Sequence, residues 1–216
     1  APGKRHATDR KVTDLLYLSH EHSKQGLGFD QICELIAERF RGIADELGVS
    51  TDLGGLLDEA KRGIAEAAEG GEGPDYAASR GEYLNGRLIA DLLGATFVDA
   101  GEAIFFDARG RLDEAKTYPT VAERLGTLER AVVPGFYGRS HDGGVRTFSR
   151  GGSDITGAIV ARGVEAEVYE NWTDVSGLLM ADPGVVDEPH AMAAVTYREL
   201  RELSYMGARV LHDEAV

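Results

Sequence analysis

The spacing of the apolar residues changes near residue 95, and this change restricts the fold more than any other feature of the sequence. From Thr8 to Leu93 apolar side chains recur at three- to four-residue intervals, which is typical of one face of an α-helix. After Ala95 short apolar runs alternate with further helical stretches. This alternation predicts an α/β fold: a mainly parallel central sheet covered by helices on both faces, in a three-layer αβα sandwich.

The individual elements can be placed from the same pattern. The expected helices are Thr8–Lys24, Phe29–Leu47, Asp52–Ala68, Asp75–Leu93, Thr120–Leu128, a helix that Ser153 caps, and Thr196–Met206. The expected strands are Thr96–Asp99, Ala103–Phe106, Ala131–Val133, Val145–Ser149 and Ala166–Trp172. In such sheets ligands bind at the carboxyl ends of the strands.

Composition narrows the class of protein. With 216 residues, 43% of them hydrophobic and 28% charged, the chain can bury one sizeable core. Its formal net charge of -14 would repel nucleic acid and an anionic membrane, so we expect neither as a partner. The single cysteine, Cys33, is expected to pack in the core. One thiol cannot form a disulfide within the chain, and no apolar run is long enough to span a bilayer, so we expect a cytoplasmic protein.

The two ends of the sequence do not look like natural chain ends. The chain begins APGKRH without an initiator methionine, and it ends HDEAV directly after a helical pattern. We therefore expect that both ends are cut from a longer protein.

Several common site motifs are absent from the sequence. No phosphate-binding loop of the G-x-x-x-x-G-K-[ST] type occurs, and Gly26-x-Gly28 lacks the third glycine and the preceding strand of a dinucleotide fingerprint. His20 and His22 are two residues apart on a helix, which favours a solvated face over a metal site. No Cys/His cluster has zinc spacing, so no metal ligands are predicted.

Three polar clusters are candidates for chemistry. The first is Arg150-Gly-Gly-Ser-Asp154, where a strand meets a helix whose free backbone N–H groups can bind an anion. The second is Asn171-Trp-Thr-Asp174 at the end of an apolar strand, and the third is Gly81-Glu82 within a helical pattern. Taken singly, each is more typical of a cap or turn. Two of them, however, lie at the strand ends where sites concentrate.

The sequence around these clusters resembles the aspartokinase family. The similarity rests on FSRGGSDITGAIVARG, then YENWTDVSGLLMADPGVV and ELRELSYMGARVLHDEA, together with SRGEYLNGRLIADLLG and VVPGFYG. It runs over residues 1–216 as a partial catalytic domain of the amino-acid kinase (carbamate kinase-like) fold. It is weakest over 27–73, which we expect to form a helical subdomain within that domain.

The resemblance implies roles for individual residues. Arg150 and Asp154 would be catalytic, and L-aspartate would be bound by Thr13, Glu82, Phe136, Arg150, Gly151, Gly152 and Ser153. ATP would be bound by Thr173, Asp174, Leu179, Gly184, Arg209 and Val210. The implied reaction is Mg²⁺-dependent attack of the aspartate β-carboxylate on the γ-phosphorus of ATP, in the pathway to lysine, threonine and methionine. A homo-oligomer is expected for the full-length protein.

The sequence also departs from the family pattern. The family's first strand, with its phosphate-binding lysine, and its regulatory ACT domains have no counterpart here. Leu179 stands where an aromatic residue is common, Gly184 where a basic one is, and Arg209 where lysine is. The nucleotide contacts are therefore less well supported than the aspartate contacts. Two alternatives stay open: an acetylglutamate or uridylate kinase of the same fold, and a ligand-binding domain that has lost catalysis.

Overall fold

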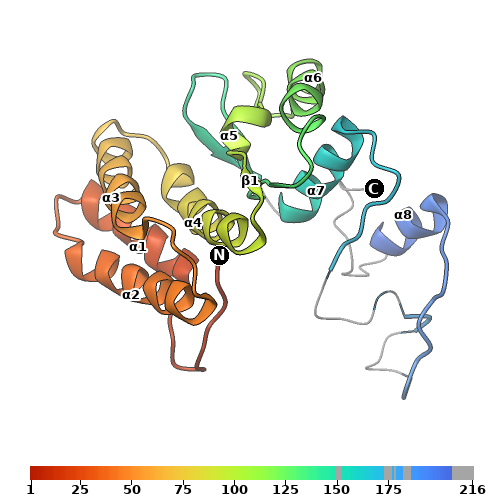
Figure 1. The fold of residues 1–216 in the computed structure, drawn as a ribbon, viewed down its shortest axis with the longest axis horizontal. Helices are drawn as coiled ribbons and strands as arrows, with labels where there is room; N and C mark the ends of the chain where they lie inside the picture. Colours follow the sequence, from red (N-terminus) through yellow and green to blue (C-terminus); the bar gives the residue numbers. More distant parts are fainter. Residues whose placement is uncertain (149–151, 173–176, 178, 182–185, 206–216) are drawn as a thin grey trace.

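The computed structural model describes residues 1–148, 152–172, 177, 179–181 and 186–205. The predicted residues Arg150, Gly151, Thr173, Asp174, Gly184, Arg209 and Val210 lie outside this part of the chain. A cluster of helices comes first in sequence, and strands alternate with helices after it (Figure 1).

Four helices form the first half of the molecule, as the apolar spacing predicts. They are α1 (Val12–Lys24), α2 (Asp30–Leu47), α3 (Leu53–Glu69) and α4 (Asp75–Leu93), and they pack against one another (Figure 1). Their shared core includes Leu16, Phe40, Ile64 and Leu84, all of which are fully buried. These helices supply most of the apolar burial that holds the fold together.

A small parallel sheet begins where α4 ends. Strand β1 (Thr96–Phe97) pairs in parallel with β2 (Ala131–Val132), so that Thr96 lies opposite Ala131. An antiparallel hairpin follows, formed by β3 (Tyr137–Arg139) and β4 (Val145–Thr147). Helix α4 packs on β1, β2 and β4, which places its inner face against both sheets. The parallel pairing of helix-linked strands agrees with the predicted α/β class.

The remaining helices lie beyond the sheets. They are α5 (Ala100–Ala103), α6 (Glu114–Leu125), α7 (Gly152–Gly163) and α8 (Tyr197–Tyr205), and α6 packs on α7 (Figure 1). Helix α6 starts at Glu114, before the expected Thr120, because the Asp113 side chain accepts a hydrogen bond from Lys116 N at 3.1 Å and caps it. None of the described helices is long and apolar enough to cross a bilayer.

Two of the expected strands are wrong. Residues 103–106 finish the short helix α5 and then make single bridges, Phe105 to Arg139 and Phe106 to Leu112. Residues 166–172 form no strand, because no neighbouring strand pairs with them in the described chain. Trp172 in this segment is 89% exposed. Apolar runs alone do not supply the partner that a strand requires.

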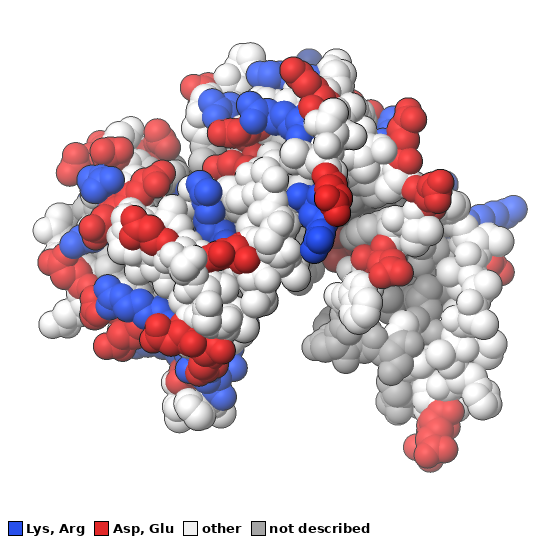
Figure 2. Space-filling model, in the orientation of Figure 1, with Lys and Arg blue, Asp and Glu red and all other residues white. Residues whose placement is uncertain are grey.

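Charged side chains of both signs cover the helical cluster. In Figure 2, acidic and basic groups are interspersed over α1 to α4, and this face carries no continuous basic surface.

Candidate functional site

Glu82 lies in the middle of α4, beside the residues that precede α1. Its carboxylate lies against the backbone nitrogen of Ala1, the first residue of the sequence. A Cβ on the preceding Gly81 would lie only 2.8 Å from Ala1 Cβ and 3.2 Å from Leu16 Cδ1. Glycine at this position therefore lets α4 approach its neighbours closely. Thr13 is partly buried one turn before Leu16 in α1, so Thr13 and Glu82 come from two helices in direct contact.

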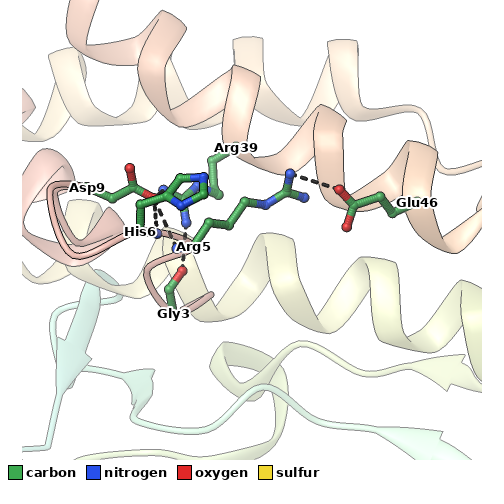
Figure 3. A network of polar contacts seen from close by, with 6 residues as sticks. All are labelled: Gly3, Arg5, His6, Asp9, Arg39 and Glu46. Atoms are coloured by element: carbon green, nitrogen blue, oxygen red, sulfur yellow. Dashed lines mark hydrogen bonds and ion pairs between the residues drawn. The ribbon is translucent and has the colours of Figure 1, made fainter.

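Residues 1–11, here called the N-terminal loop, are held against α2 by Asp9 and Arg39 (Figure 3). The Arg39 guanidinium donates to Asp9 Oδ2 at 2.5 Å and to the Gly3 carbonyl at 2.7 Å. The backbone N–H groups of Arg5 and His6 also donate to Asp9 Oδ2, each at 3.0 Å. The hydrogen bond from His6 is the main cause that holds the pKa of Asp9 below its ordinary value. The loop next to Glu82 is thus held by a carboxylate whose Oδ2 accepts three hydrogen bonds.

Phe136 has a backbone conformation that is rare for a residue with a side chain. Its φ angle is 81°, in the left-handed region. Hydrogen bonds hold it from both sides: Phe136 N donates to Thr156 Oγ1 at 3.1 Å, and Phe136 O accepts from Phe148 N at 2.9 Å. Strained residues that neighbours lock in this way are often found at ligand sites.

The first turn of α7 packs tightly against residues 133–136 between β2 and β3, here called the Phe136 loop. A Cβ on Gly152 would lie 2.9 Å from Phe136 Cα, and a Cβ on Gly135 would lie 3.0 Å from Ser153 Cα. Ser153 is exposed and Asp154 is partly buried, both in the first turn of the helix. The expectation that Ser153 is the N-cap is wrong, since α7 already begins at Gly152. The structure therefore brings Phe136, Gly152 and Ser153 together at a helix N-terminus, where backbone N–H groups favour an anion.

A tyrosine connects this turn with the segment that follows α7. The Tyr169 hydroxyl donates to the Asp154 carbonyl at 3.4 Å. A Cβ on Gly157 would overlap that hydroxyl, so glycine makes room for it. Tyr169 therefore anchors the chain shortly before Thr173 and Asp174. Of the expected nucleotide residues, Leu179 is described, and it makes a single bridge to Ala191 away from any longer strand.

The sequence analysis did not predict one feature on the side of α4 that faces the sheets. There, aromatic side chains form a cage around the Arg80 guanidinium. Arg80 is only 5% exposed, and its guanidinium stacks 4.5 Å from the centre of the Tyr76 ring and 4.4 Å from that of Tyr83. It also lies 5.6 Å from the ring of Tyr137, which donates its hydroxyl proton to Asp99 Oδ1 at 2.8 Å. Burial, and then the charge of Asp99, raise the pKa of Tyr137. Because Tyr137 follows Phe136, the cage joins α4 to the Phe136 loop.

The spacing of Tyr76, Arg80 and Tyr83 in the sequence is the signal that could have found the cage. These residues are four and three apart, which puts them on one face of a helix. The partner Tyr137 is distant in sequence and carries no comparable signal.

The histidines and the cysteine differ from expectation in burial. His20 is buried, not solvated, because its Nε2 donates to the Glu72 carbonyl at 3.1 Å, whereas His22 Nδ1 donates to the Gly28 carbonyl at 3.3 Å. Within the described residues, no group of three His, Cys, Asp or Glu side chains is placed to hold a metal ion. Cys33 is half-buried in the wall of a cavity of about 190 Å³ among α1 to α4, and burial raises the pKa of its thiol.

Solved structures resemble this arrangement over the whole chain. The aspartate kinase of Clostridium acetobutylicum is 52% identical, with a TM-score of 0.90 over 100% of this chain and 48% of that one. E. coli aspartokinase III, solved with aspartate and ADP, is 26% identical, with a TM-score of 0.70 over 96% of this chain and 50% of that one. These similarities confirm the predicted fold.

Sequence comparison gives a consistent result. Aspartokinase 3 of Bacillus subtilis is 36% identical over 100% of this chain and 50% of its own length. The chain thus spans about half the length of this relative. The model of the amino acid kinase family matches residues 40–216. The chain therefore belongs to the amino acid kinase family.

Proposed function

We propose that this chain is the catalytic half of an aspartate kinase. It would transfer the γ-phosphoryl group of ATP to the β-carboxylate of L-aspartate, giving 4-phospho-L-aspartate for the synthesis of lysine, threonine and methionine. The observation that carries the proposal is the 52% identity to an aspartate kinase along the entire chain. The motif Arg150-Gly-Gly-Ser-Asp154 supports it.

The aspartate half of the site is assigned to α4, the Phe136 loop and the start of α7. Glu82, whose side chain is 28% exposed, would bind the α-ammonium of aspartate through a charge-assisted contact. Arg150 would bind a substrate carboxylate with both arms of its guanidinium. The backbone N–H groups of Gly151, Gly152 and Ser153 would add to that anion site. Thr13 and Phe136 would line it.

Catalysis of this phosphoryl transfer requires mainly the positioning of the reactants and the neutralisation of charge. The β-carboxylate is already ionised at neutral pH, so its attack needs no general base. Asp154 would order the cationic groups around the transferred phosphoryl, and its carboxylate is of the ligand type that Mg²⁺ prefers. Mg²⁺ on the ATP phosphates would supply further positive charge. The protein's part is then to hold the carboxylate in line with the γ-phosphorus.

The remaining expectations are proposals of the same kind. Thr173, Asp174, Leu179, Gly184, Arg209 and Val210 would contact ATP. Residues 1–216 would form one partial catalytic domain, with 27–73 as a helical subdomain inside it. The complete protein would be a cytoplasmic homo-oligomer whose partners are L-aspartate and ATP.

An acceptor comparison tests the function. The complete gene product that carries this chain is incubated with Mg-ATP and L-aspartate, N-acetylglutamate or UMP, and acyl phosphate is trapped as hydroxamate while ADP release is followed. We expect turnover with aspartate alone. Turnover with N-acetylglutamate or UMP would support another kinase of this fold, and binding of ATP without any turnover would support a domain that has lost catalysis.

A further inference from the structure

The N-terminal loop has neither helix nor strand, yet it lies over the part of α4 that carries Glu82. The Ala1 side chain packs so closely on Gly81 that a Cβ there would be 2.8 Å away. Ala1 also packs against the main hydrophobic core. A loop without secondary structure keeps such a position only if other contacts offset the entropy of ordering it.

Most of those contacts converge on the Arg39 guanidinium, and the more exposed pair of Arg5 and Glu46 also joins the loop to α2. Arg39 Nη1 holds the Gly3 carbonyl near the start of the loop, and Nη2 holds the Asp9 carboxylate near its end. Asp9 in turn accepts from the backbone of Arg5 and His6, which folds the loop back on itself. Figure 3 shows these groups meeting between the loop and α2. A planar fork with two donor arms can hold both ends at once, which a single ammonium does less well.

The burial of this ion pair sets it apart from its neighbours on the same helix. The side chains of Arg39 and Asp9 are 13% and 22% exposed. Those of Arg41 and Glu34, also paired on α2, are 51% and 57% exposed. A shielded, multiply hydrogen-bonded pair constrains geometry, whereas an exposed pair is screened and contributes little.

We propose that Asp9 and Arg39 are positioning residues for the substrate's amino group. Their ion pair fixes the N-terminal loop over Gly81 and Glu82, and this placement sets the affinity of Glu82 for an ammonium. The proposal rests on the proposed aspartate kinase activity. Neither residue touches the substrate.

Steady-state kinetics of the complete gene product tests the proposal. With Asp9→Asn or Arg39→Met, we expect the KM for aspartate to rise roughly tenfold, while kcat and the KM for ATP stay within about twofold. Arg39→Lys should give an intermediate KM, because the charge remains and the fork is lost. The matched control is Arg41→Met, which removes the exposed pair and should leave all three constants unchanged.

A second measurement separates failure of this inference from failure of the proposed function. Hydrogen exchange of the backbone amides of residues 3–9 and 80–83 is compared in the same variants. We expect faster exchange in both segments in Arg39→Met and no change in Arg41→Met. If the unmodified protein phosphorylates aspartate but Arg39→Met leaves its KM unchanged, the positioning role is wrong and the function stands. If the unmodified protein does not act on aspartate, the proposed function is wrong. Hydrogen exchange still tests the loop in that case: exchange as slow in Arg39→Met as in the unmodified protein would show that Arg39 does not anchor the N-terminal loop.

Discussion

Arg80 carries its charge into the protein interior, and no carboxylate pairs with it in the described part of the chain. Its hydrogen bonds go to the Ser79 hydroxyl, at 3.1 Å from Nε and 3.0 Å from Nη2. The faces of Tyr76, Tyr83 and Tyr137 add to the stabilisation, since the negative face of an aromatic ring attracts a desolvated cation. At the residue scale, the cage replaces an ion pair with aromatic quadrupoles.

Replacement of Arg80 should therefore be costly. A desolvated cation–π contact contributes roughly 2 kcal/mol, so Arg80→Lys, which keeps charge but loses planar stacking, should lower the free energy of unfolding by about 1–2 kcal/mol. Urea unfolding followed by circular dichroism measures this. Arg130→Met is the control, because its side chain is 67% exposed. A change in Arg80→Lys no larger than in the control would contradict the cage.

Helix α7 and the Phe136 loop are in close backbone contact at Gly152. Gly152 allows the backbones to touch, and Thr156 links them through its hydroxyl, which accepts from Phe136 N and donates to the Gly152 carbonyl at 2.6 Å. The position of the helix N-terminus, and hence of Ser153 and Asp154, depends on this contact. At the element scale, the anion site is a property of the packing of two segments rather than of one motif.

The substitution Gly152→Ala tests this packing. Its Cβ would lie 2.9 Å from Phe136 Cα, so the helix must shift, and we expect kcat/KM for aspartate to fall at least about tenfold. The free energy of unfolding should fall as well, because the added Cβ meets backbone, and the gain of roughly 0.5–1 kcal/mol from alanine applies to the middle of a helix rather than to its first residue. Gly28→Ala is the control, since nothing lies within 4 Å of its added Cβ. Equal activity in the two variants would show that the contact does not position the site.

At the scale of the whole molecule, the sequence predicted the parts that depend on local pattern. The helices α1 to α4 were predictable because many turns of regular apolar spacing specify them. The strands were harder to predict, since β1 and β2 contain only two residues each and exist through pairing. The apolar run 166–172 was misread for the same reason.

The residues of the candidate site likewise differ in whether a local sequence pattern indicates them. The stretches Gly81-Glu82 and Arg150–Asp154 could be singled out as candidates from the sequence, because the chemistry of a short polar stretch can be read without the structure. The positive φ of Phe136, the cage around Arg80 and the anchor formed by Asp9 and Arg39 depend on segments far apart in the chain. Such contacts leave no local pattern, and only the folded structure brings them together.

Recognition of an ammonium by Glu82 is the most direct test of the account. Calorimetry would compare the binding of L-aspartate with that of succinate, which has both carboxylates but lacks the amino group. In Glu82→Gln, aspartate affinity should fall about 10–100-fold because a charge-assisted contact is lost, while succinate affinity should stay within about twofold. If aspartate and succinate weaken equally, or if neither changes, Glu82 does not bind the substrate's amino group and the proposed aspartate site is wrong.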